Sequence, residues 1–503
     1  METKRLLFFL ASIIIMNAVL ACSLIPKLLT DDSETHNIPS DEKNVKNKDE
    51  NEDNTTDEKK VTDGSDEINE GKKEPIVGEW EQIDITSLTN NKNIVLYSGT
   101  LFREYRYTTT QPKPSNNKTQ GAELWRTSDG ATWEMVGEPG MGNPENHELL
   151  VYAWKDHLYV AANGNYTYSI WESQDGETFQ KIQEGEKSKK ILHAILHVVG
   201  DHLMLLVMPY QEGVQGWASA DGKTFEKVFD GGMGNSNNFS FCNLGGLNLP
   251  LLNNWSFLCV RNNEDGGEIW RSKDGIDWEK VLTGGYDDAT NASVMPEYLF
   301  NNYLYAIAYN ANGVNIFRTD DGKQWEKVVS NGFDIGKNQA SMGWFNTYKG
   351  DLYFLTTNDD PRLWGSSGIP KPSNENNPDE NGTGSENVQS DWSYSESFPL
   401  TGFRLWKSTD GKSWEQISDP GFGNPNNFQG IILTIRDVFY LVAFNYHDGN
   451  QIWRSTDGEN WEVFYTFPAS PTNEGGGLVE YRDSLLYHEN DIQQGIQYWR
   501  YGP

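Results

Sequence analysis

Apolar runs of about six residues alternate with short polar turns along most of this chain. Pairs of such runs flank a two-residue turn in LLVYAWKDHLYVAA at 149–162, in YLFNNYLYAIAY at 298–309 and in IILTIRDVFYLVAF at 431–444. Short apolar runs around Lys-Asp, Asn-Asn or Arg-Asp are typical of antiparallel strands joined in a hairpin. The pattern therefore predicts two strands, A and B, in each repeating unit.

A second hairpin follows each pair and carries a recurring Asp-Gly phrase. LWRTSDGATWEMV begins at 124 and IWRSTDGENWEVF at 452, with five further copies between them. The seven aspartates are Asp129, Asp175, Asp221, Asp274, Asp321, Asp410 and Asp457. Their spacings are 46, 46, 53, 47, 89 and 47 residues, and periods near these values are typical of propeller blades. We expect strands C and D around a type I′ turn, with Arg454 paired across to Trp461.

The two ends of the repeat region complete each other. GEWEQI at 78–83 is similar to a D strand, and IQYWRY at 496–501 is similar to a C strand. Together they give an eighth C–D pair, so we predict an all-β fold over residues 76–503. This fold is an eight-bladed β-propeller of four-stranded antiparallel blades, closed by the N-terminal strand on the C-terminal blade. Seven blades is the alternative, and the 89-residue spacing indicates a low-complexity insertion at about 360–402.

Residues 1–75 differ in composition from the repeats. Lys4 and Arg5 precede an apolar run of 16 residues at 6–21, which is shorter than a membrane span of about 20 residues and is typical of a signal peptide. The run ends in VLAC, which resembles a bacterial lipobox. The resemblance implies a lipoprotein signal peptide at 1–21, export, a lipid on Cys22 and anchoring to a membrane of the cell envelope. An ordinary signal peptide or an uncleaved anchor is the alternative. Residues 22–75 are expected to form a disordered acidic tether, since 31–75 holds 16 Asp and Glu against seven Lys.

The phrase [ST]-x-D-G-x-x-[WF] resembles the Asp-box, or BNR repeat, of sialidase-superfamily propellers. The resemblance implies that the seven aspartates are structural and lie on the face away from the ligand. Sialidases bind a substrate carboxylate with three convergent arginines, and the arginines placed to reach the ligand face are Arg103, Arg106, Arg261 and Arg362. No Arg-Ile-Pro segment occurs in the chain, and no catalytic residue is predicted.

Metal and cysteine chemistry give few signals. His193 and His197 would lie about 13 Å apart on one strand, which is too far to share a metal ion. No HExxH or paired-cysteine zinc motif occurs, so no metal and no cofactor are predicted. Cys242 and Cys259 flank an A–B hairpin, and they form either a disulfide or two free thiols.

The D–A and B–C loops are the expected ligand face, opposite the Asp-Gly phrases. The D–A loops repeat as GMGNPEN, GMGNSNN and GFGNPNN, in which Asn143, Asn235 and Asn424 could form a ring of amides around a polar ligand. The alternative is that these are rigid loops, because Gly permits positive φ and Asn caps turns. The exposed aromatic candidates in the B–C loops and the insertion are Tyr166, Tyr168, Tyr210, Tyr309, Tyr446, Trp392 and Tyr394.

The formal charge of −32 disfavours a nucleic-acid partner. We expect a monomeric, non-enzymatic, lipid-anchored surface protein that binds a glycan or a protein partner through its loop face. A sialidase-like or other glycoside hydrolase is one alternative. An assembly factor for a membrane complex is another.

Overall fold

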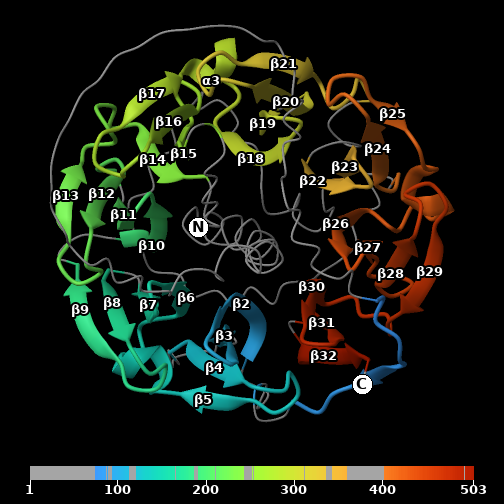
Figure 1. Ribbon diagram of the computed structural model, residues 1–503, viewed down its shortest axis with the longest axis horizontal. Coiled ribbons are helices and arrows are strands. Elements are labelled where there is room, and N and C mark those ends of the chain that lie inside the picture. Colours follow the sequence, from blue (N-terminus) through green and yellow to red (C-terminus); the bar gives the residue numbers. More distant parts are fainter. Residues whose placement is uncertain are drawn as a thin grey trace, which may run out of the picture.

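The computed structural model describes most of the chain after residue 73. The described residues are 74–85, 88, 93–112, 121–164, 166–185, 191–209, 211–242, 252, 254–310, 312–335, 342–358, 401–491 and 493–502. They form eight four-stranded antiparallel sheets arranged as blades around a central channel (Figure 1). The prediction of an eight-bladed β-propeller is therefore confirmed, and the seven-bladed alternative is wrong.

Blades 1 to 4 follow one another from the innermost to the outermost strand. They contain β2 (Asn93–Phe102), β3 (Tyr105–Pro112), β4 (Glu123–Thr127) and β5 (Glu134–Val136); β6 (Glu148–Trp154), β7 (His157–Asn163), β8 (Tyr168–Ser173) and β9 (Gln180–Glu184); β10 (Ile191–Val199), β11 (His202–Pro209), β12 (Gln215–Ser219) and β13 (Glu226–Phe229); and β14 (Asn238–Phe241), β15 (Ser256–Asn262), β16 (Glu268–Ser272) and β17 (Glu279–Leu282).

Blades 5 to 8 complete the ring. They contain β18 (Val294–Phe300), β19 (Tyr303–Asn310), β20 (Gly313–Thr319) and β21 (Glu326–Val329); β22 (Met342–Tyr348), β23 (Asp351–Thr357), β24 (Arg404–Ser408) and β25 (Glu415–Gln416); β26 (Gln429–Ile435), β27 (Val438–Phe444), β28 (Gln451–Ser455) and β29 (Glu462–Thr466); and β30 (Asn473–Tyr481), β31 (Ser484–Asp491), β32 (Gly495–Tyr501) and β1 (Trp80–Gln82). Three short helices, η2 (Pro139–Gly142), α3 (Gly284–Asp287) and η3 (Pro420–Gly423), lie in the loops that enter blades 2, 5 and 7.

The ring closes where the sequence predicts it. Strand β1 pairs with β32 in the register Trp80 to Tyr501, Glu81 to Arg500 and Gln82 to Trp499. The Trp80 ring lies 5.4 Å from the Tyr501 ring and 5.6 Å from Phe467 of blade 7, so it joins the two blades. Because the first strand is the outermost strand of the last blade, the sheet of blade 8 is completed from both ends of the chain (Figure 1).

The Asp-Gly loops differ from the predicted type I′ turn. Gly458 has φ of 83°, but Asp457 is not among the non-glycine residues with positive φ. Its Oδ1 instead accepts hydrogen bonds from the backbone N–H groups of Glu459 (2.9 Å) and Asn460 (2.7 Å), which lengthens the loop. Arg454 consequently pairs with Glu462 rather than with Trp461, a shift of one residue.

The tight turns with positive φ lie instead between strands A and B. Lys155 and Asp156 have φ of 45° and 59°, and Arg436 and Asp437 have 47° and 60°. These values are unfavourable for side chains with a Cβ, but the Lys155 ammonium donates to the Asp201 carbonyl of the next blade at 3.0 Å. The A–B turns therefore link neighbouring blades on the same face as the Asp-Gly loops.

Neighbouring blades also pack against each other through the glycines of the seven Asp-Gly loops. A Cβ at Gly458 would overlap the hydroxyl of Tyr353, which projects from strand B of blade 6. Gly222 and Tyr159 make the same contact between blades 2 and 3. These glycines are required both by their positive φ and by the close approach of a buried tyrosine.

The predicted insertion falls between β23 and β24, on the B–C side of blade 6. Residues 359–400, which hold nearly all of it, lie outside the described residues. In the part of the chain that the structure describes, no helix combines the length and the apolar character needed to cross a bilayer.

Candidate ligand-binding face

The D–A and B–C loops share the face opposite the Asp-Gly loops, because antiparallel strands alternate in direction across each blade. The D–A loops reverse through two consecutive residues with positive φ. Gly421 and Phe422 have φ of 56° and 53°, and Gly140 and Met141 have 62° and 55°. Phe422 packs on Trp453 at 4.6 Å between ring centroids, so a half-buried side chain attaches the loop to the blade that it enters.

An aspartate joins the D–A loop to the B–C loop in blade 7. The Oδ2 atom of Asp448 accepts hydrogen bonds from the side-chain amides of Asn424 (2.9 Å), Asn426 (3.2 Å) and Asn445 (3.2 Å). Together with His447, these amides lower the pKa of Asp448, and the amide of Asn424 has the largest effect. We call this arrangement the aspartate lock, because one carboxylate holds side chains of both loops.

The aspartate lock recurs in blade 4 and, with hydroxyl donors, in blade 8. Asp265 accepts from Asn235 at 2.9 Å, from Asn262 at 3.3 Å and from Asn237 at 3.5 Å. In blade 8, the side chains of Ser470 and Thr472 donate to Asp491 in the same way. In blade 5 the two partners exchange places, since Asn310 of the B–C side donates to Asp288 of the D–A loop at 3.1 Å.

The aspartate locks decide the status of the three predicted amide ligands. The amide groups of Asn235 and Asn424 are engaged by Asp265 and Asp448, which favours the rigid-loop alternative for these two positions. Asn143 differs, because its Oδ1 accepts from the Glu145 N–H at 3.1 Å while no described carboxylate accepts from its amide nitrogen. The sequence does carry a signal for the locks, N-x-x-D-G at 262–266 and 445–449. It lies in the B–C loops, outside the strand and Asp-Gly repeats from which the fold was predicted.

The tyrosine candidates differ widely in exposure. Tyr166 is 57% exposed, whereas Tyr168 is only 5% exposed and packs over Gly185, so the expectation of an exposed Tyr168 is wrong. Tyr446 is half-buried against Phe428 at 4.7 Å between ring centroids. Tyr309 is half-buried too, and burial raises its pKa well above the usual value. Tyr210, Trp392 and Tyr394 lie outside the described residues.

The arginines expected near the ligand face do not converge. Arg103 lies in the A–B turn of blade 1 and donates to the Gln174 carbonyl at 2.6 Å, so it lies on the Asp-Gly side and the prediction for it was wrong. Arg106 lies on β3 of blade 1 and Arg261 on β15 of blade 4, well apart in the ring (Figure 1). Arg362 lies outside the described residues. Among the described residues, no set of three arginines therefore forms a carboxylate-binding site.

Two buried carboxyl groups, Glu489 and Asp491, lie two residues apart on β31. Burial raises the pKa of Glu489 to about 7, although Tyr487 and Asn450 donate to its carboxylate at 3.0 and 2.9 Å. Asp491 lies two residues further along and accepts hydrogen bonds from two backbone N–H groups. Glu489 is only 3% and Asp491 only 1% exposed, and both carboxyl groups already accept hydrogen bonds from the protein, so this pair is not placed to act on a substrate. The hydrogen bond from Asn450 to Glu489 joins blades 7 and 8.

The paired histidines on β10 are also structural. His193 and His197 are each only 3% exposed. Burial lowers the pKa of His197 to about 4, and Nε2 of His193 lies 3.0 Å from a carboxylate oxygen of Glu148. In the described ranges, no group of three or more His, Cys, Asp or Glu could hold a metal ion.

The seven aspartates of the Asp-Gly loops serve the fold. Backbone N–H groups of Thr224 and Lys223, together with the Ser219 hydroxyl, lower the pKa of Asp221 to about 2. The equivalent bonds recur at the other six aspartates; for example, the N–H of Glu177 donates to Asp175 at 2.8 Å. A carboxylate saturated by its own loop is poorly suited to bind a ligand.

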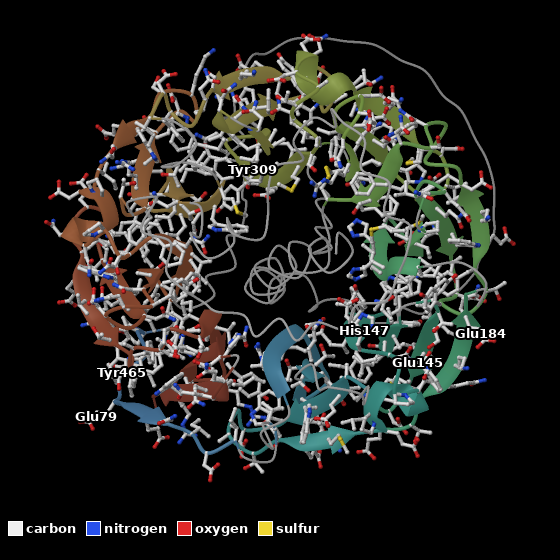
Figure 2. The ribbon with its side chains drawn as sticks, turned by 180° about the vertical axis from the view of Figure 1, so that it is seen from behind. Glu79, Glu145, His147, Glu184, Tyr309 and Tyr465 are labelled. Atoms are coloured by element: carbon white, nitrogen blue, oxygen red, sulfur yellow. A yellow bond between two sulfur atoms is a disulfide. The ribbon has the colours of Figure 1, made fainter. Side chains whose placement is uncertain are left out.

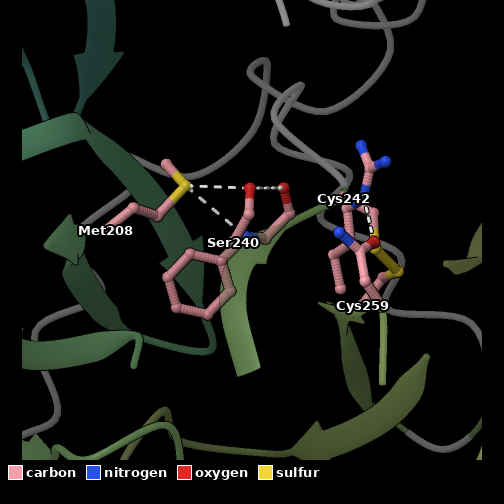
Figure 3. Close-up of a disulfide and its surroundings, with 7 residues drawn as sticks. Met208, Ser240, Cys242 and Cys259 are labelled. Atoms are coloured by element: carbon pink, nitrogen blue, oxygen red, sulfur yellow. Dashed lines mark hydrogen bonds between the residues drawn. A yellow bond between two sulfur atoms is a disulfide. The ribbon is translucent and has the colours of Figure 1, made fainter. Parts of the chain in front are cut away.

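A disulfide joins Cys242 and Cys259 across the first two strands of blade 4 (Figure 3). The backbone N–H of Cys242 also donates to the carbonyl of Cys259 at 3.0 Å. On the other side of β14, Ser240 donates to the sulfur of Met208 in blade 3 at 3.2 Å (Figure 3). The disulfide therefore fixes the innermost strand of blade 4 against its neighbour.

Comparison with known proteins gives distant structural neighbours only. No protein-family model matches the chain, and no curated protein sequence matches it. The chain is similar to a prolyl endopeptidase (TM-score 0.43, 10% identity, 80% of this chain and 55% of that chain). It is also similar to the alpha-L-arabinanase of Penicillium chrysogenum complexed with arabinobiose (TM-score 0.35, 10% identity, 85% and 97%).

An ancestral GH74 enzyme gives a TM-score of 0.39 with 14% identity, over 81% of this chain and 54% of that chain. This chain thus spans about half the length of the prolyl endopeptidase and of the GH74 enzyme. At such low identities and TM-scores, likeness to these enzymes gives no evidence about the activity of this chain. The propeller assignment therefore rests on the eight sheets of the chain itself.

Proposed function

We propose that this chain is a glycan-binding propeller of the cell envelope, held at a membrane by a lipid on Cys22 and the acidic tether. The VLAC sequence and the composition of residues 31–75 support the anchor. The hydrogen bonds within the Asp-Gly loops support the resemblance to Asp-box propellers. Binding rather than catalysis is favoured because the buried carboxyl pair, Glu489 and Asp491, is not placed to act on a substrate.

The observation that carries the proposal is a patch of accessible polar side chains and one exposed ring at blade 2, in which Nδ1 of His147 lies 3.3 Å from the Glu145 carbonyl. The patch consists of Asn143, Glu145, His147 and Tyr166; Glu145 and His147 are labelled in Figure 2. The loop of Tyr166 packs directly on the D–A loop, since a Cβ at Gly164 would lie 3.2 Å from the Glu145 carbonyl. An exposed aromatic face next to amide, carboxylate and imidazole groups suits a sugar, which offers C–H groups on one side and hydroxyls at its edge.

Aspartate locks hold the loop faces of blades 4, 7 and 8, whereas blade 2 has no aspartate in the equivalent B–C position. Blade 2 therefore leaves the Asn143 amide available to a ligand, while the same amide in blades 4 and 7 is used by the protein.

The test is a glycan array probed with residues 74–503, followed by titration of the best ligand. Tyr166→Ala should weaken binding about tenfold or more without changing the unfolding midpoint. Asn143→Ala should weaken binding by a similar factor and lower the midpoint slightly, because it also removes the acceptor of the Glu145 N–H. Asn235→Ala is the matched control, because this amide is engaged by Asp265 and its loss should affect stability but not binding. Absence of any glycan ligand would refute the proposal. Capture of a protein partner alone, or turnover of fluorogenic glycosides, would replace it with one of the alternative functions.

A further inference from the structure

The seam between blade 8 and blade 1 contains a cluster of polar side chains within an apolar interior. The apolar part includes Leu96, Trp125, Val479, Leu486 and Tyr498, which form one buried cluster across the two blades. Between them lie the polar residues Arg106 and Thr110 of β3 and His488 and Asn490 of β31. We call these four residues the seam cluster.

Strand register places the members of the seam cluster on the two strand faces, of β3 and of β31, that meet at the seam. Arg106 and Thr110 are separated by an even number of residues on β3, so both project toward blade 8. Asn490 accepts from the backbone N–H of Leu96 at 3.0 Å, and Leu96 is the cross-strand partner of Thr110. His488 lies two residues before Asn490 on β31 and therefore on the same face.

Arg106 is near enough to act electrostatically on this part of β31. Its charge contributes to lowering the pKa of His488 to about 3, after the larger effect of burial. It also acts on Tyr498, the cross-strand partner of His488, although burial raises the pKa of that hydroxyl to about 12. At neutral pH the seam cluster therefore carries one positive charge, with His488 and Tyr498 both neutral.

The donors of the seam cluster are not used by the protein. The amide nitrogen of Asn490, the Thr110 hydroxyl and Nε2 of His488 are buried and have no hydrogen-bond partner among the described residues. Asn490 is 1% and Thr110 0% exposed. No described carboxylate pairs with Arg106. Glu123, which faces Thr110 across the sheet, accepts from the Trp125 indole at 3.1 Å.

Buried polar groups are normally hydrogen-bonded, so several unpaired donors beside one guanidinium indicate a missing acceptor. The innermost strands carry no side chain beside the seam cluster, since Gly477 is the cross-strand partner of His488 and Gly99 is the partner of Thr108. Both glycines lie on the innermost strands of their blades, β30 and β2 (Figure 1).

We propose that the seam cluster binds a small oxyanion, a carboxylate or a phosphate-type group. The guanidinium of Arg106 supplies the charged contact, and Asn490, Thr110 and His488 supply neutral contacts. This site lies in a different part of the ring from the blade 2 patch, so each proposal stands or fails without the other.

The proposal is tested by calorimetric titration of the full chain with sodium phosphate, sodium sulfate and sodium acetate at pH 7. Sodium chloride at equal ionic strength serves as the reference. We expect saturable binding of at least one oxyanion, accompanied by a higher unfolding temperature than in chloride. Comparison of acetate with phosphate and sulfate distinguishes a carboxylate site from a tetrahedral oxyanion site.

Arg106→Gln should weaken this binding about tenfold or more, because it removes a charged donor. Arg103→Gln is the matched control. It removes the same charge from the same hairpin, but Arg103 contacts the Gln174 carbonyl of blade 2 and not blade 8, so binding should be unchanged. If Arg106→Gln does not fold, Asn490→Asp provides the second variant, in which a nearly isosteric carboxylate should abolish oxyanion binding. Absence of saturable binding, or equal affinity in the variants and the parent, would overturn the proposal.

Discussion

The contact between Gly458 and Tyr353 makes a measurable prediction about how neighbouring blades hold together. Gly458 has φ of 83°, and a Cβ added there would lie 3.0 Å from Cζ of Tyr353 and closer still to its hydroxyl. Gly350 is a matched control from the same region, because its φ is 88° but no atom lies within 4 Å of its added Cβ. Gly350→Ala therefore measures the backbone cost alone, and Gly458→Ala measures this cost plus the overlap.

The backbone term is about 1–2 kcal/mol for an alanine in the left-handed region. Overpacking of a close-packed site adds about 1–3 kcal/mol, so Gly458→Ala should lower the free energy of unfolding by roughly 2–5 kcal/mol. In a Tyr353→Phe background the hydroxyl is absent, and the cost of Gly458→Ala should fall by roughly 1 kcal/mol or more. Urea unfolding followed by tryptophan fluorescence measures all four variants. The reasoning is refuted if Gly458→Ala costs no more than Gly350→Ala, or costs the same in both backgrounds.

Three further variants test the ring closure, a buried acid and an aspartate lock. Trp80→Ala removes a half-buried ring that joins blades 7 and 8, so we expect a loss of roughly 2–3 kcal/mol and faster hydrogen exchange in β32; unchanged exchange there would contradict this role. Glu489 has a pKa of about 7 in the folded chain against a usual 4.5, so its stabilising contribution is complete below pH 4.5 and is lost as the pH rises through 7. Glu489→Gln should therefore match the parent in unfolding free energy near pH 4 and exceed it by about 3 kcal/mol at pH 8, whereas a constant difference would exclude this linkage. Asp448→Ala leaves three amides without their acceptor, and we expect a loss of roughly 1–3 kcal/mol with increased exchange confined to 424–428 and 445–450; exchange that increases throughout blade 7 would speak against a local lock.

The repeat pattern predicted the architecture well because each blade is specified locally. Apolar runs separated by Arg-Asp or Asn-Asn gave strands A and B, and the unmatched ends at 78–83 and 496–501 gave the eighth blade. The register within the C–D hairpin was wrong by one residue. The Asp457 side chain replaces backbone partners for two N–H groups, and a rule based on two-residue hairpins does not include such a bond.

The candidate site was less predictable, because the same motif has different surroundings in different blades. Asn143, Asn235 and Asn424 occupy equivalent positions in near-identical loops, but only the latter two face an aspartate from another loop. Such a difference depends on contacts between segments about 25 residues apart. The seam cluster depends on still longer separations, since Asn490 and Leu96 are 394 residues apart.

Because β1 and β32 lie near opposite ends of the propeller sequence, the order of synthesis decides when these two strands can pair. Glu81 and Arg500 form an ion pair across 419 residues, so the first strand to be made has no partner until the last one has emerged. Seven blades can assemble in sequence, but the circle stays open until the final residues arrive. Deletion of residues 495–503 would remove β32 and with it the strand that pairs with β1. An intact C-terminal strand is therefore needed to hold the N-terminal strand in the sheet.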